Sequence, residues 1–587
     1  MSKWIEIRKS GDFTEWGKAL GIDPLCARVI RNRGAETVED ARKYLEGGEE
    51  LLHDPFLLPD MDKAVEGLLR YIDSEKKIRI IGDYDVDGVT STYILVSCIE
   101  AAGGNVSYAI PHRQKDGYGI NDEMVKDASD DGVELIITCD NGISAAKQIE
   151  YAYELGLEVI VTDHHQVPTQ EDPAGKTIEI LPSCIAVVDP HRKESIYPFK
   201  GICGAMVAYK FMTALEKRRS SGELKDALLK ARQFAALGTV CDVMELTDEN
   251  RVIVRFGLED MKKTENIGIR ALMESNNLSS SNLSTYSMGF VIGPSINSTG
   301  RLESAAESVG LLLSDDRSEC LKSAVRIREL NDERKDMTLT GYESAVKMIE
   351  EKGLLKDKVL VIYLPDAHES IAGLIAGRLK ERFFRPVLVI TKGEEGLKGS
   401  GRSIPAYNMF EKFSEVKELF TKMGGHAMAA GFSLDESNLR TLAEKLNENA
   451  DLTDDDLEKP VMIDAVVPLD YPSIKLLKDL EKIEPVGTGN PGALFAQKDA
   501  EVVSVSRMGK DRKYGTLMVR SGRRTFRMTY FGDMDEFDAY ISSKYSPELL
   551  NELYEKNGSA KINICYELKI NDYRGNENVD YRLKYYM

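Results

Sequence analysis

Long apolar runs are missing from this sequence of 587 residues. No stretch approaches the ~20 consecutive apolar residues that a membrane span needs, and the first residues, MSKWIEIRKSGDFTEW, contain no apolar run that could act as a signal peptide. Cysteine is scarce too: the 8 cysteines are scattered without a CxxC pair, which argues against a disulfide framework and against a cysteine-bound zinc site. We therefore expect a reduced, cytoplasmic protein that does not associate with membranes.

An excess of basic residues, the usual mark of nucleic-acid binders, is also missing. The 77 Lys and Arg residues are outnumbered by 97 Asp and Glu residues, and the net charge is −20. An acidic surface repels phosphates at long range. The total charge does not exclude a nucleic-acid substrate, however, because a positive field can be confined to a groove, and carboxylates that bind metal form a cationic site once loaded.

The chain is too long for one ordinary domain, and 42% hydrophobic with 30% charged residues is the composition of a globular protein with several cores. Residues 1–75 predict a helical segment, and residues 76–250 alternate β-rich runs with helical stretches, which is typical of a mostly parallel sheet. Residues 251–350 predict a helical connector ending in a long polar helix, and residues 351–455 a second α/β domain. Residues 456–587 contain short strands and turn residues, which indicates a small β-barrel.

Acidic and histidine side chains follow several predicted strands of the first sheet. Loops at the carboxyl ends of parallel strands meet at one edge of a sheet, where α/β proteins place their sites. We therefore expect these side chains to lie close together. They are Asp83, Asp85 and Asp87 after the first strand, Asp140 after the third, Asp163, His164 and His165 after the fourth, and Asp242 after the apolar segment AALGTVCD.

The segment DYDVDG allows two other interpretations. It matches the opening of an EF-hand calcium loop, but Ile94 occupies the twelfth position, where a bidentate glutamate is required, and a predicted strand rather than a helix precedes it. A single aspartate can also serve only as a turn or helix cap. Three alternating carboxylates on one short loop repel each other unless a positive charge lies between them, which favours a metal site.

Carboxylates with few histidines and no thiolates are the ligands of hard or borderline metals, so Mn²⁺ or Mg²⁺ is expected rather than zinc. The ligands suffice for two ions. Two metals about 3.5–4 Å apart can activate a water and hold the attacking and leaving oxygens of a phosphate ester. The residues therefore predict a two-metal phosphoesterase.

Several motifs resemble those of a known superfamily. DYDVDG, CDNG and TDHH, with the Asp242 loop, resemble the DHH phosphoesterases in order and spacing, and GGHAMAAGF is similar to the signature of their accessory DHHA1 domain. Five further segments resemble the RecJ family within this superfamily: PHRQKDGYG, VVDPHR, INSTGRL, GSGRSIP and EPVGTGNP. The resemblance spans nearly the whole chain. It implies a multidomain α/β fold: a DHH domain with a mostly parallel sheet, a DHHA1-type α/β domain joined by a long helix, and a C-terminal OB-fold β-barrel.

The resemblance also implies roles for the acidic loops. His165 would contact the scissile phosphate, and Asp163 would orient the histidines. Ile81 stands where many RecJ sequences carry a histidine, so that a water would replace one metal ligand. The implied metal ligands are Asp85, Asp87, Asp140, His164 and Asp242. Asp140 would be shared by both ions, and Asp83 would be either a further ligand or a hydrogen-bond partner of a ligand.

Recognition of a strand end is implied by a second set of residues. Arg113, Ser400 and Arg402 would form a 5′-phosphate pocket, since guanidinium and hydroxyl groups suit a terminal phosphate. Arg301 and His426 would contact backbone phosphates nearer the metals. A surface salt bridge is the alternative for any single arginine.

In the expected OB fold, residues 507–528 combine many cations with a single acid, Asp511, and with the aromatics Tyr514 and Phe526. Cations along a groove with aromatics between them are typical of single-strand binding. A solvated hairpin face is the alternative.

Three functions are consistent with these features. The first is a metal-dependent 5′→3′ exonuclease that hydrolyses single-stranded DNA to 5′-mononucleotides in DNA repair and recombination, as a monomer with a single-strand-binding protein and a helicase as partners. The second is another DHH phosphoesterase acting on short oligoribonucleotides or cyclic dinucleotides, although such relatives are generally shorter and lack the β-rich tail. The third is a non-catalytic replication scaffold, against which the intact aspartates and histidines argue. Strand polarity follows from the resemblance alone.

Overall fold

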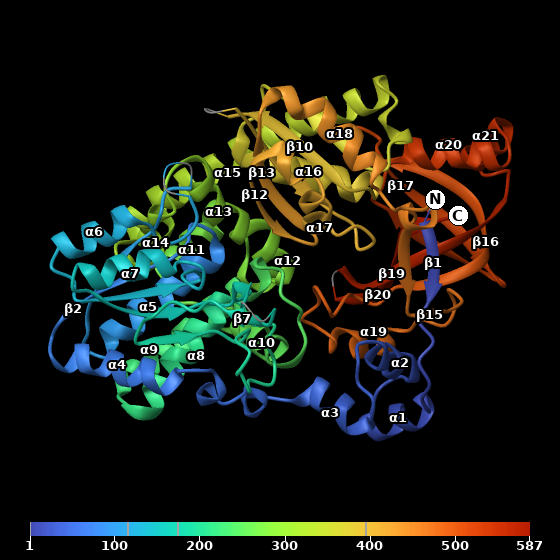
Figure 1. Cartoon of the computed structure of the whole chain (residues 1–587). Coiled ribbons are helices and arrows are strands. Elements are labelled where there is room, and N and C mark those ends of the chain that lie inside the picture. Colours follow the sequence, from blue (N-terminus) through green and yellow to red (C-terminus); the bar gives the residue numbers. More distant parts are fainter. Residues whose placement is uncertain (1, 114, 116, 173–174, 394–395, 574) are drawn as a thin grey trace. The chain divides into compact units, whose positions relative to one another are not determined.

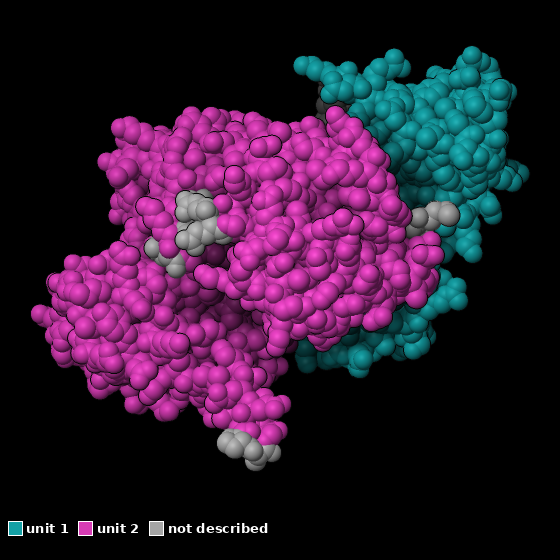
Figure 2. Space-filling model, turned by 45° about the horizontal axis from the view of Figure 1, so that its top comes forward, with its two compact units in different colours: residues 1–51, 460–587 teal, residues 52–459 magenta. Residues whose placement is uncertain are grey.

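The computed structural model describes residues 2–113, 115, 117–172, 175–393, 396–573 and 575–587 (Figure 1). The chain divides into two compact units (Figure 2). Unit 1 comprises residues 1–51 and 460–587, and unit 2 comprises residues 52–459. The predicted helical segment 1–75 is therefore divided between the two units, because its first part and its last part pack into different cores.

Unit 2 is built around a five-stranded parallel sheet with the strand order β3-β2-β4-β5-β8. Side chains alternate between its two faces, so that Ile80 and Ile137 pack against α4, α5 and α8, whereas Ile136 and Val159 pack against α6 and α7. The carboxyl ends of all five strands lie at one edge. The strands are β2 (Lys77–Ile81), β3 (Asn105–Ala109), β4 (Leu135–Cys139), β5 (Glu158–Thr162) and β8 (Ala186–Val188). The helices are α4 (Met61–Asp73), α5 (Val86–Ala101), α6 (Asp122–Asp130), α7 (Ala146–Glu154) and α8 (Gly204–Arg218).

After the last strand of this sheet, the chain of unit 2 continues as a series of helices. A buried ion pair ties α8 to α10: Lys210 Nζ lies 2.6 Å from Glu249 Oε2, and both side chains are almost fully buried. The helices are α9 (Gly222–Cys241), α10 (Asp248–Lys262), α11 (Ile267–Ser275), α12 (Thr285–Ser287), a π-helical turn (Met288–Ile292), α13 (Gly293–Leu302) and α14 (Ala306–Leu313). The predicted long polar helix is α15 (Arg317–Glu351).

A mixed sheet with the order β12-β13-β11-β10-β9 completes unit 2. In its register Ser400 of β11 lies between Val389 of β10 and Gly431 of β13. The strands are β9 (Leu360–Tyr363), β10 (Val387–Lys392), β11 (Leu397–Arg402), β12 (Phe420–His426) and β13 (Ala429–Leu434). Its helices are α16 (Ala372–Phe383), α17 (Met409–Ser414) and α18 (Leu439–Glu448).

Unit 1 contains a five-stranded barrel. Neighbouring strands pair in the order β16-β17-β18-β20-β19, and pairing between β16 and β19 closes the barrel. Closure removes the exposed edges that an open sheet would present. The strands are β16 (Phe495–Met508), β17 (Tyr514–Ser521), β18 (Arg524–Tyr530), β19 (Ala560–Tyr573) and β20 (Asn576–Tyr586). The helices of this part are α19 (Ile474–Glu481), α20 (Met534–Lys544) and α21 (Pro547–Glu555).

The N-terminal residues pack onto this barrel unit. The strand β1 (Ser2–Glu6) pairs with β14 (Lys459–Ile463), and helices α1 (Phe13–Leu20), α2 (Pro24–Asn32) and α3 (Val38–Glu46) contribute to its core. Arg33 makes a buried ion pair with Asp464, with 2.7 Å between Nη1 and Oδ1. Both chain ends therefore belong to unit 1 (Figure 1). Across the part of the chain that is described, no helix combines the length and the apolar character needed to cross a membrane.

Candidate active site

The loop between β2 and α5 carries three carboxylates, of which Asp83 and Asp87 are buried and Asp85 is half-buried. Asp85 is the N-cap of α5, and its Oδ1 accepts hydrogen bonds from the backbone N–H groups of Asp87 and Gly88. Asp87 accepts from two N–H groups at the start of α8, at 2.6 and 2.9 Å. Asp83 is 1% exposed, and its Oδ2 has no hydrogen-bond partner among the described residues. A buried carboxylate oxygen without a donor is costly unless a cation binds it.

Asp140 follows β4 in a left-handed backbone conformation with φ of 59°. Strained conformations of this kind concentrate at functional sites, where surrounding contacts hold them. Here the hydroxyl of Tyr118 donates to the backbone carbonyl of Asp140 at 2.6 Å, and the Asp140 N–H donates to the carbonyl of Thr162. Gly204 allows a close approach, because a Cβ atom there would lie 2.7 Å from the Asp140 Cβ.

His164 and His165 follow β5 and are held by Asp163. The buried Asp163 carboxylate accepts from the Ile143 N–H at 2.9 Å, from the His164 N–H at 2.8 Å and from His165 Nδ1 at 2.7 Å. Burial opposes ionisation of Asp163, but these donors and the positive His165 ring lower its pKa below the usual value. Burial likewise opposes a charge on His165, and the bond to Asp163 raises its pKa to about 9. Asp163 therefore fixes the orientation of the His165 ring.

The acidic loops converge on His164. Its Nε2 lies 3.1 Å from Asp140 Oδ1, 3.7 Å from Asp87 Oδ2 and 3.8 Å from Asp242 Oδ2. Three overlapping groups have ligand atoms within 4.8 Å of one another: Asp83 with Asp85 and Asp140, Asp87 with His164 and Asp242, and Asp140 with His164 and His165. The structure thus brings together all the metal ligands that the sequence predicts.

The electrostatics of this cluster call for cations. Burial, with repulsion from Asp87 and Asp85, raises the pKa of Asp242 to about 8. The same two causes raise the pKa of Asp140 well above its usual value. Oxygen donors with one or two imidazoles are the ligand set of Mg²⁺ and Mn²⁺. The residues present therefore fit two such ions.

A cavity of about 640 Å³ lies beside this cluster in unit 2 and is lined by cations. Arg402 donates to the Ser400 hydroxyl at 3.1 Å, and Arg301 donates to the Ser370 carbonyl at 2.7 Å. Burial and repulsion from the other arginines lower the pKa of Arg301 to about 9. The predicted residues Arg113, Arg301, Ser400 and Arg402 all line the cavity, together with Lys398 and Lys422. Several half-buried guanidinium groups around one cavity form a site for an anion.

His426 lies in a neighbouring cavity of about 390 Å³, which Asp163, His165 and Tyr118 also line. Tyr118 borders both cavities. The structure thus brings His426 to the same part of unit 2 as His165, as the sequence predicts. Figure 2 shows that the surface of unit 2 is hollowed on the face in view.

Comparison with known proteins agrees with this geometry. The DHH family model, N-terminal domain, matches residues 77–239, the DHHA1 domain model residues 356–451, and the RecJ OB domain model residues 463–585. The chain is 30% identical to the single-stranded-DNA-specific exonuclease RecJ of Escherichia coli over 602 residues, which covers 99% of this chain and 98% of that protein. The chain belongs to the RecJ family. The predicted family and fold class are thereby confirmed.

Other RecJ proteins match as well. The RecJ of Bacillus subtilis is 35% identical over 506 residues, and this chain spans 62% of its length. The crystal structure of RecJ from Thermus thermophilus in complex with Mn²⁺ superposes with a TM-score of 0.81 at 25% identity, covering 100% of this chain and 79% of that one. A structure of exonuclease RecJ bound to manganese covers 68% of this chain and 95% of that one, with 30% identity and a TM-score of 0.57.

Two residues of RecJ-like segments have contacts that the sequence interpretation did not assign. Tyr118 of PHRQKDGYG joins the Asp140 carbonyl to the His165 ring, whose nitrogens lie 3.2 Å from its hydroxyl. Asn297 of INSTGRL accepts from the Val86 N–H at 3.1 Å and so supports the loop of Asp85 and Asp87. The motifs themselves were the available signal, but a side chain's partner across the fold is not visible in a motif. Residues 114 and 116 of the first segment lie outside the described residues.

The basic cluster of residues 507–528 is partly neutralised within unit 1. Arg507 pairs with Asp535 and Asp538, and Arg520 with Glu501. The prediction counted acids only within the segment, whereas these acids come from other elements of the fold. The remaining cations stay exposed on β17, β18 and their turns, at Lys510, Arg512, Lys513, Arg523, Arg524 and Arg527.

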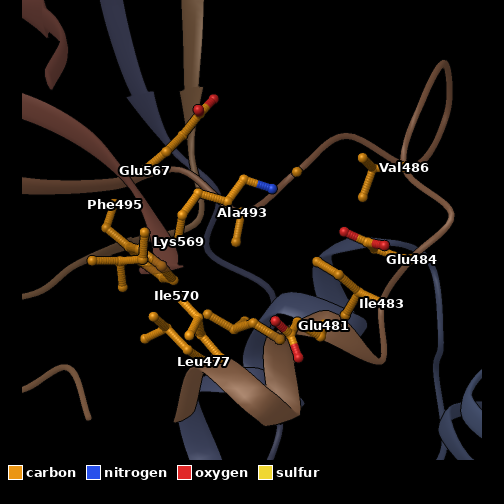
Figure 3. Close-up of a pocket in the computed structure, with 13 residues that line it drawn as sticks. Leu477, Glu481, Ile483, Glu484, Val486, Ala493, Phe495, Glu567, Lys569 and Ile570 are labelled. Carbon is orange, nitrogen blue, oxygen red and sulfur yellow. The ribbon is translucent and has the colours of Figure 1, made fainter. Parts of the chain in front are cut away.

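A further cavity of about 270 Å³ lies in unit 1 between α19 and β19 (Figure 3). Glu481, Glu484 and Glu567 are among the residues that line it, together with the cation Lys569 (Figure 3). Carboxylates repel phosphate, and none of the predicted site residues lines this cavity. The RecJ-like segment EPVGTGNP contributes to its wall, and Asn490 holds that segment through bonds to the carbonyls of Ile483 and Pro485.

Proposed function

We propose that this chain is a metal-dependent exonuclease that removes 5′-mononucleotides from single-stranded DNA, in DNA repair and recombination. One observation carries the proposal: a carboxylate–histidine cluster suited to two cations lies beside an arginine-lined cavity in the same unit. A cavity for a terminal phosphate next to a hydrolytic centre is what an enzyme that starts at a strand end requires. The RecJ relatives are named single-stranded-DNA-specific exonucleases.

Asp83, Asp85, Asp87, Asp140, His164 and Asp242 would hold two Mn²⁺ or Mg²⁺ ions. Bound there, the ions would supply an activated water and neutralise charge on the phosphate. The solved RecJ structures titled with Mn²⁺ and Mg²⁺ support this choice. Asp140 would serve as a ligand of both ions, as the family resemblance implies; it belongs to two of the three ligand groups, as His164 also does.

The other residues bind and orient the substrate. Arg113 and Arg402 would hold the 5′-phosphate with the Ser400 hydroxyl, and Arg301 the next phosphate. Gly373 keeps this cavity open, since a Cβ atom there would lie 2.9 Å from both Arg402 Nη2 and Ser400 Oγ. Such a pocket favours 5′→3′ polarity because it recognises the phosphorylated end of the strand.

His165 is the donor placed for the scissile phosphate. Asp163 keeps its ring protonated and oriented, so that the other ring nitrogen can donate to an oxygen on which charge develops. His426 borders the same cavity and would contact a backbone phosphate. Preorganised donors of this kind commonly account for a large part of rate enhancement.

The alternatives have less support. The closed barrel and the RecJ OB match extend over residues that a short DHH phosphoesterase lacks. A non-catalytic scaffold has no need to maintain a buried, mutually repelling carboxylate cluster. We also propose that the enzyme works as a monomer in the cytoplasm, and that a helicase and a single-strand-binding protein are partners, because the reaction needs unwound DNA.

To test this proposal, the protein is incubated in Mn²⁺ with 5′-labelled and 3′-labelled single-stranded DNA, duplex DNA and short RNA. Early release of a labelled mononucleotide from the 5′ end of single strands alone is the expected result. Preference for di- or trinucleotide RNA would instead support the second function, and no hydrolysis in any metal the third. The Asp140→Ala variant should be inactive but folded, and activity retained by that variant would refute the metal assignment.

A further inference from the structure

One helical run ends at the candidate active site. Residues 285–302 are continuously helical through α12, the π-helical turn and α13 (Figure 1). Arg301, near its end, lines the arginine cavity, and Asn297 contacts the metal-binding loop through the Val86 N–H. The π-helical turn at Met288–Ile292 precedes them, and turns of this type are frequent at functional sites.

A pair of aromatic side chains stands at the other end of this run. The rings of Tyr286 and Phe290 are stacked, with centroids 4.9 Å apart and planes inclined by 18°. Yet Tyr286 is 66% exposed and Phe290 is 67% exposed, so the pair does not serve the protein core. Large exposed aromatic surfaces commonly mark binding sites.

The aromatic pair and the catalytic contacts belong to the same helical run. Tyr286 and Phe290 lie four residues apart and stack on each other, and Asn297 and Arg301 lie four residues apart near the other end of the run. Gly289 and Gly293, on either side of Phe290 in the chain, pack against the end of α9, where a Cβ atom on Gly293 would lie 2.4 Å from Cys241 Sγ. Cys241 immediately precedes Asp242, so the backbone of this part of the run lies against residues next to a predicted metal ligand.

The order along the run defines a direction for the substrate. Arg301 marks the cavity for the 5′-terminal phosphates, and Asn297 marks the metal-binding loop. Phe290 lies seven residues beyond Asn297, which is about 10 Å along a helix. A strand that followed the run past the metals, away from the arginine cavity, would reach the aromatic pair.

We propose that Tyr286 and Phe290 form a stacking platform for bases of the single strand on the 3′ side of the scissile bond. The proposal rests on the proposed exonuclease function and adds a binding site to it. Every base has a π-face, so stacking on such a platform holds any sequence, as a nuclease without sequence preference needs. Double-stranded DNA hides those faces, so the platform also favours unpaired strands.

The test uses 5′-phosphorylated oligothymidylates with phosphorothioate linkages, which slow cleavage, and a single 2-aminopurine at successive positions from the 5′ end. Stacking on an aromatic ring quenches this fluorophore. With Mn²⁺, the unaltered protein should quench it at one or two adjacent internal positions. The Tyr286→Leu/Phe290→Leu variant, which keeps apolar bulk without rings, should lose that quenching and bind the oligonucleotides about 10-fold more weakly.

Matched controls separate the platform from other effects. Tyr286→Phe should keep both quenching and affinity. Tyr153→Leu removes an aromatic that is 41% exposed at the end of α7, at the amino edge of the sheet, and should change neither. The double variant should keep the melting temperature of the unaltered protein, which shows that it is folded.

Three results would overturn the proposal: quenching and affinity unchanged in the double variant, equal losses in the Tyr153→Leu control, or a change in self-association of the double variant with DNA binding intact. The last would mean that the aromatic pair contacts a second copy of the chain. If the unaltered protein cleaves no single-stranded DNA at all, the proposed function fails. If it cleaves normally and the double variant behaves identically on long strands, only the platform fails.

Discussion

Replacing Asp163 by asparagine tests the part of the site that does not touch the metals directly. The carboxylate accepts N–H groups on both oxygens: Oδ2 accepts from Ile143, and Oδ1 accepts from the backbone of His164 and of His165 and from the His165 ring. Asparagine is nearly isosteric with aspartate but has a single acceptor oxygen. In the variant, the amide NH₂ of the new side chain must therefore face one of the N–H donors that the carboxylate now accepts.

The magnitude follows from which contacts survive. If the amide oxygen keeps the three donors on the histidine side, the buried Ile143 N–H loses its acceptor, and an unsatisfied buried group costs about 1–3 kcal/mol of unfolding free energy. The variant therefore folds but is less stable. Its negative charge is gone, so the pKa of His165, held at about 9 in part by Asp163, falls. Loss of one preorganised donor to a developing charge lowers kcat by about 10²–10³-fold.

The assay compares kcat and KM for release of the 5′ nucleotide, together with chemical denaturation. The matched control is Asp189→Asn, directly after β8, the next strand of the sheet. Asp189 is buried, and its burial and the nearby Asp163 charge raise its pKa to about 8, so that asparagine resembles its neutral form. The control should retain activity within a few-fold. An Asp163→Asn enzyme with unaltered kcat and KM would refute the reasoning.

Other consequences can be measured in the same way. Arg402→Ala should reduce the preference for a 5′-phosphorylated over a 5′-hydroxyl end by about 10- to 100-fold in competition assays, as expected for a lost charge-assisted bond, and an unchanged preference would remove Arg402 from the pocket. Without metal, in EDTA, the pKa of Asp242 is about 8 in the folded state and about 3.9 in the unfolded state, so the contribution of Asp242 to stability decreases as the pH rises from 4 to 8. Mn²⁺ should therefore raise the melting temperature more at pH 8 than at pH 6. An equal rise at both pH values would contradict this assignment. Lys210→Met leaves the buried Glu249 carboxylate without its cation and should cost about 3–5 kcal/mol in denaturant titrations; a loss below about 1 kcal/mol, typical of exposed pairs, would show that this pair is hydrated.

The acidic loops were predictable because their positions depend on local pattern and one topological rule. Short apolar runs alternating with helices predict parallel strands, and the ends of such strands meet at one edge. The pattern of the sequence therefore suffices to group Asp83, Asp140 and His164. Their backbone was not predictable: the left-handed conformation of Asp140 depends on contacts with Tyr118 and Thr162 from other elements.

The arginine cavity shows the opposite case. Arg113, Arg301 and Arg402 come from three distant segments, and no periodicity relates them. Their grouping in the sequence interpretation came from resemblance to the RecJ family, and their packing around one cavity is a property of unit 2. Arg507 was interpreted wrongly for a related reason: its charge is neutralised by Asp535 and Asp538 of a neighbouring helix, and a count of charges within one segment misses them.

The sequence by itself determined the chemistry and the architecture of this protein: the ligand types, the parallel sheet that presents them and the succession of α/β and β-rich domains, since each depends on residue identity and short-range pattern. Only the tertiary structure decided how residues 1–51 are used, which strands pair to close the predicted barrel, and that Tyr286 and Phe290 stack while exposed on the helical run that carries Arg301. The physical reason is range. Hydrophobic periodicity and turn residues act over a few positions, whereas strand pairing, ion pairing and the grouping of side chains from distant segments depend on which distant surfaces bury each other.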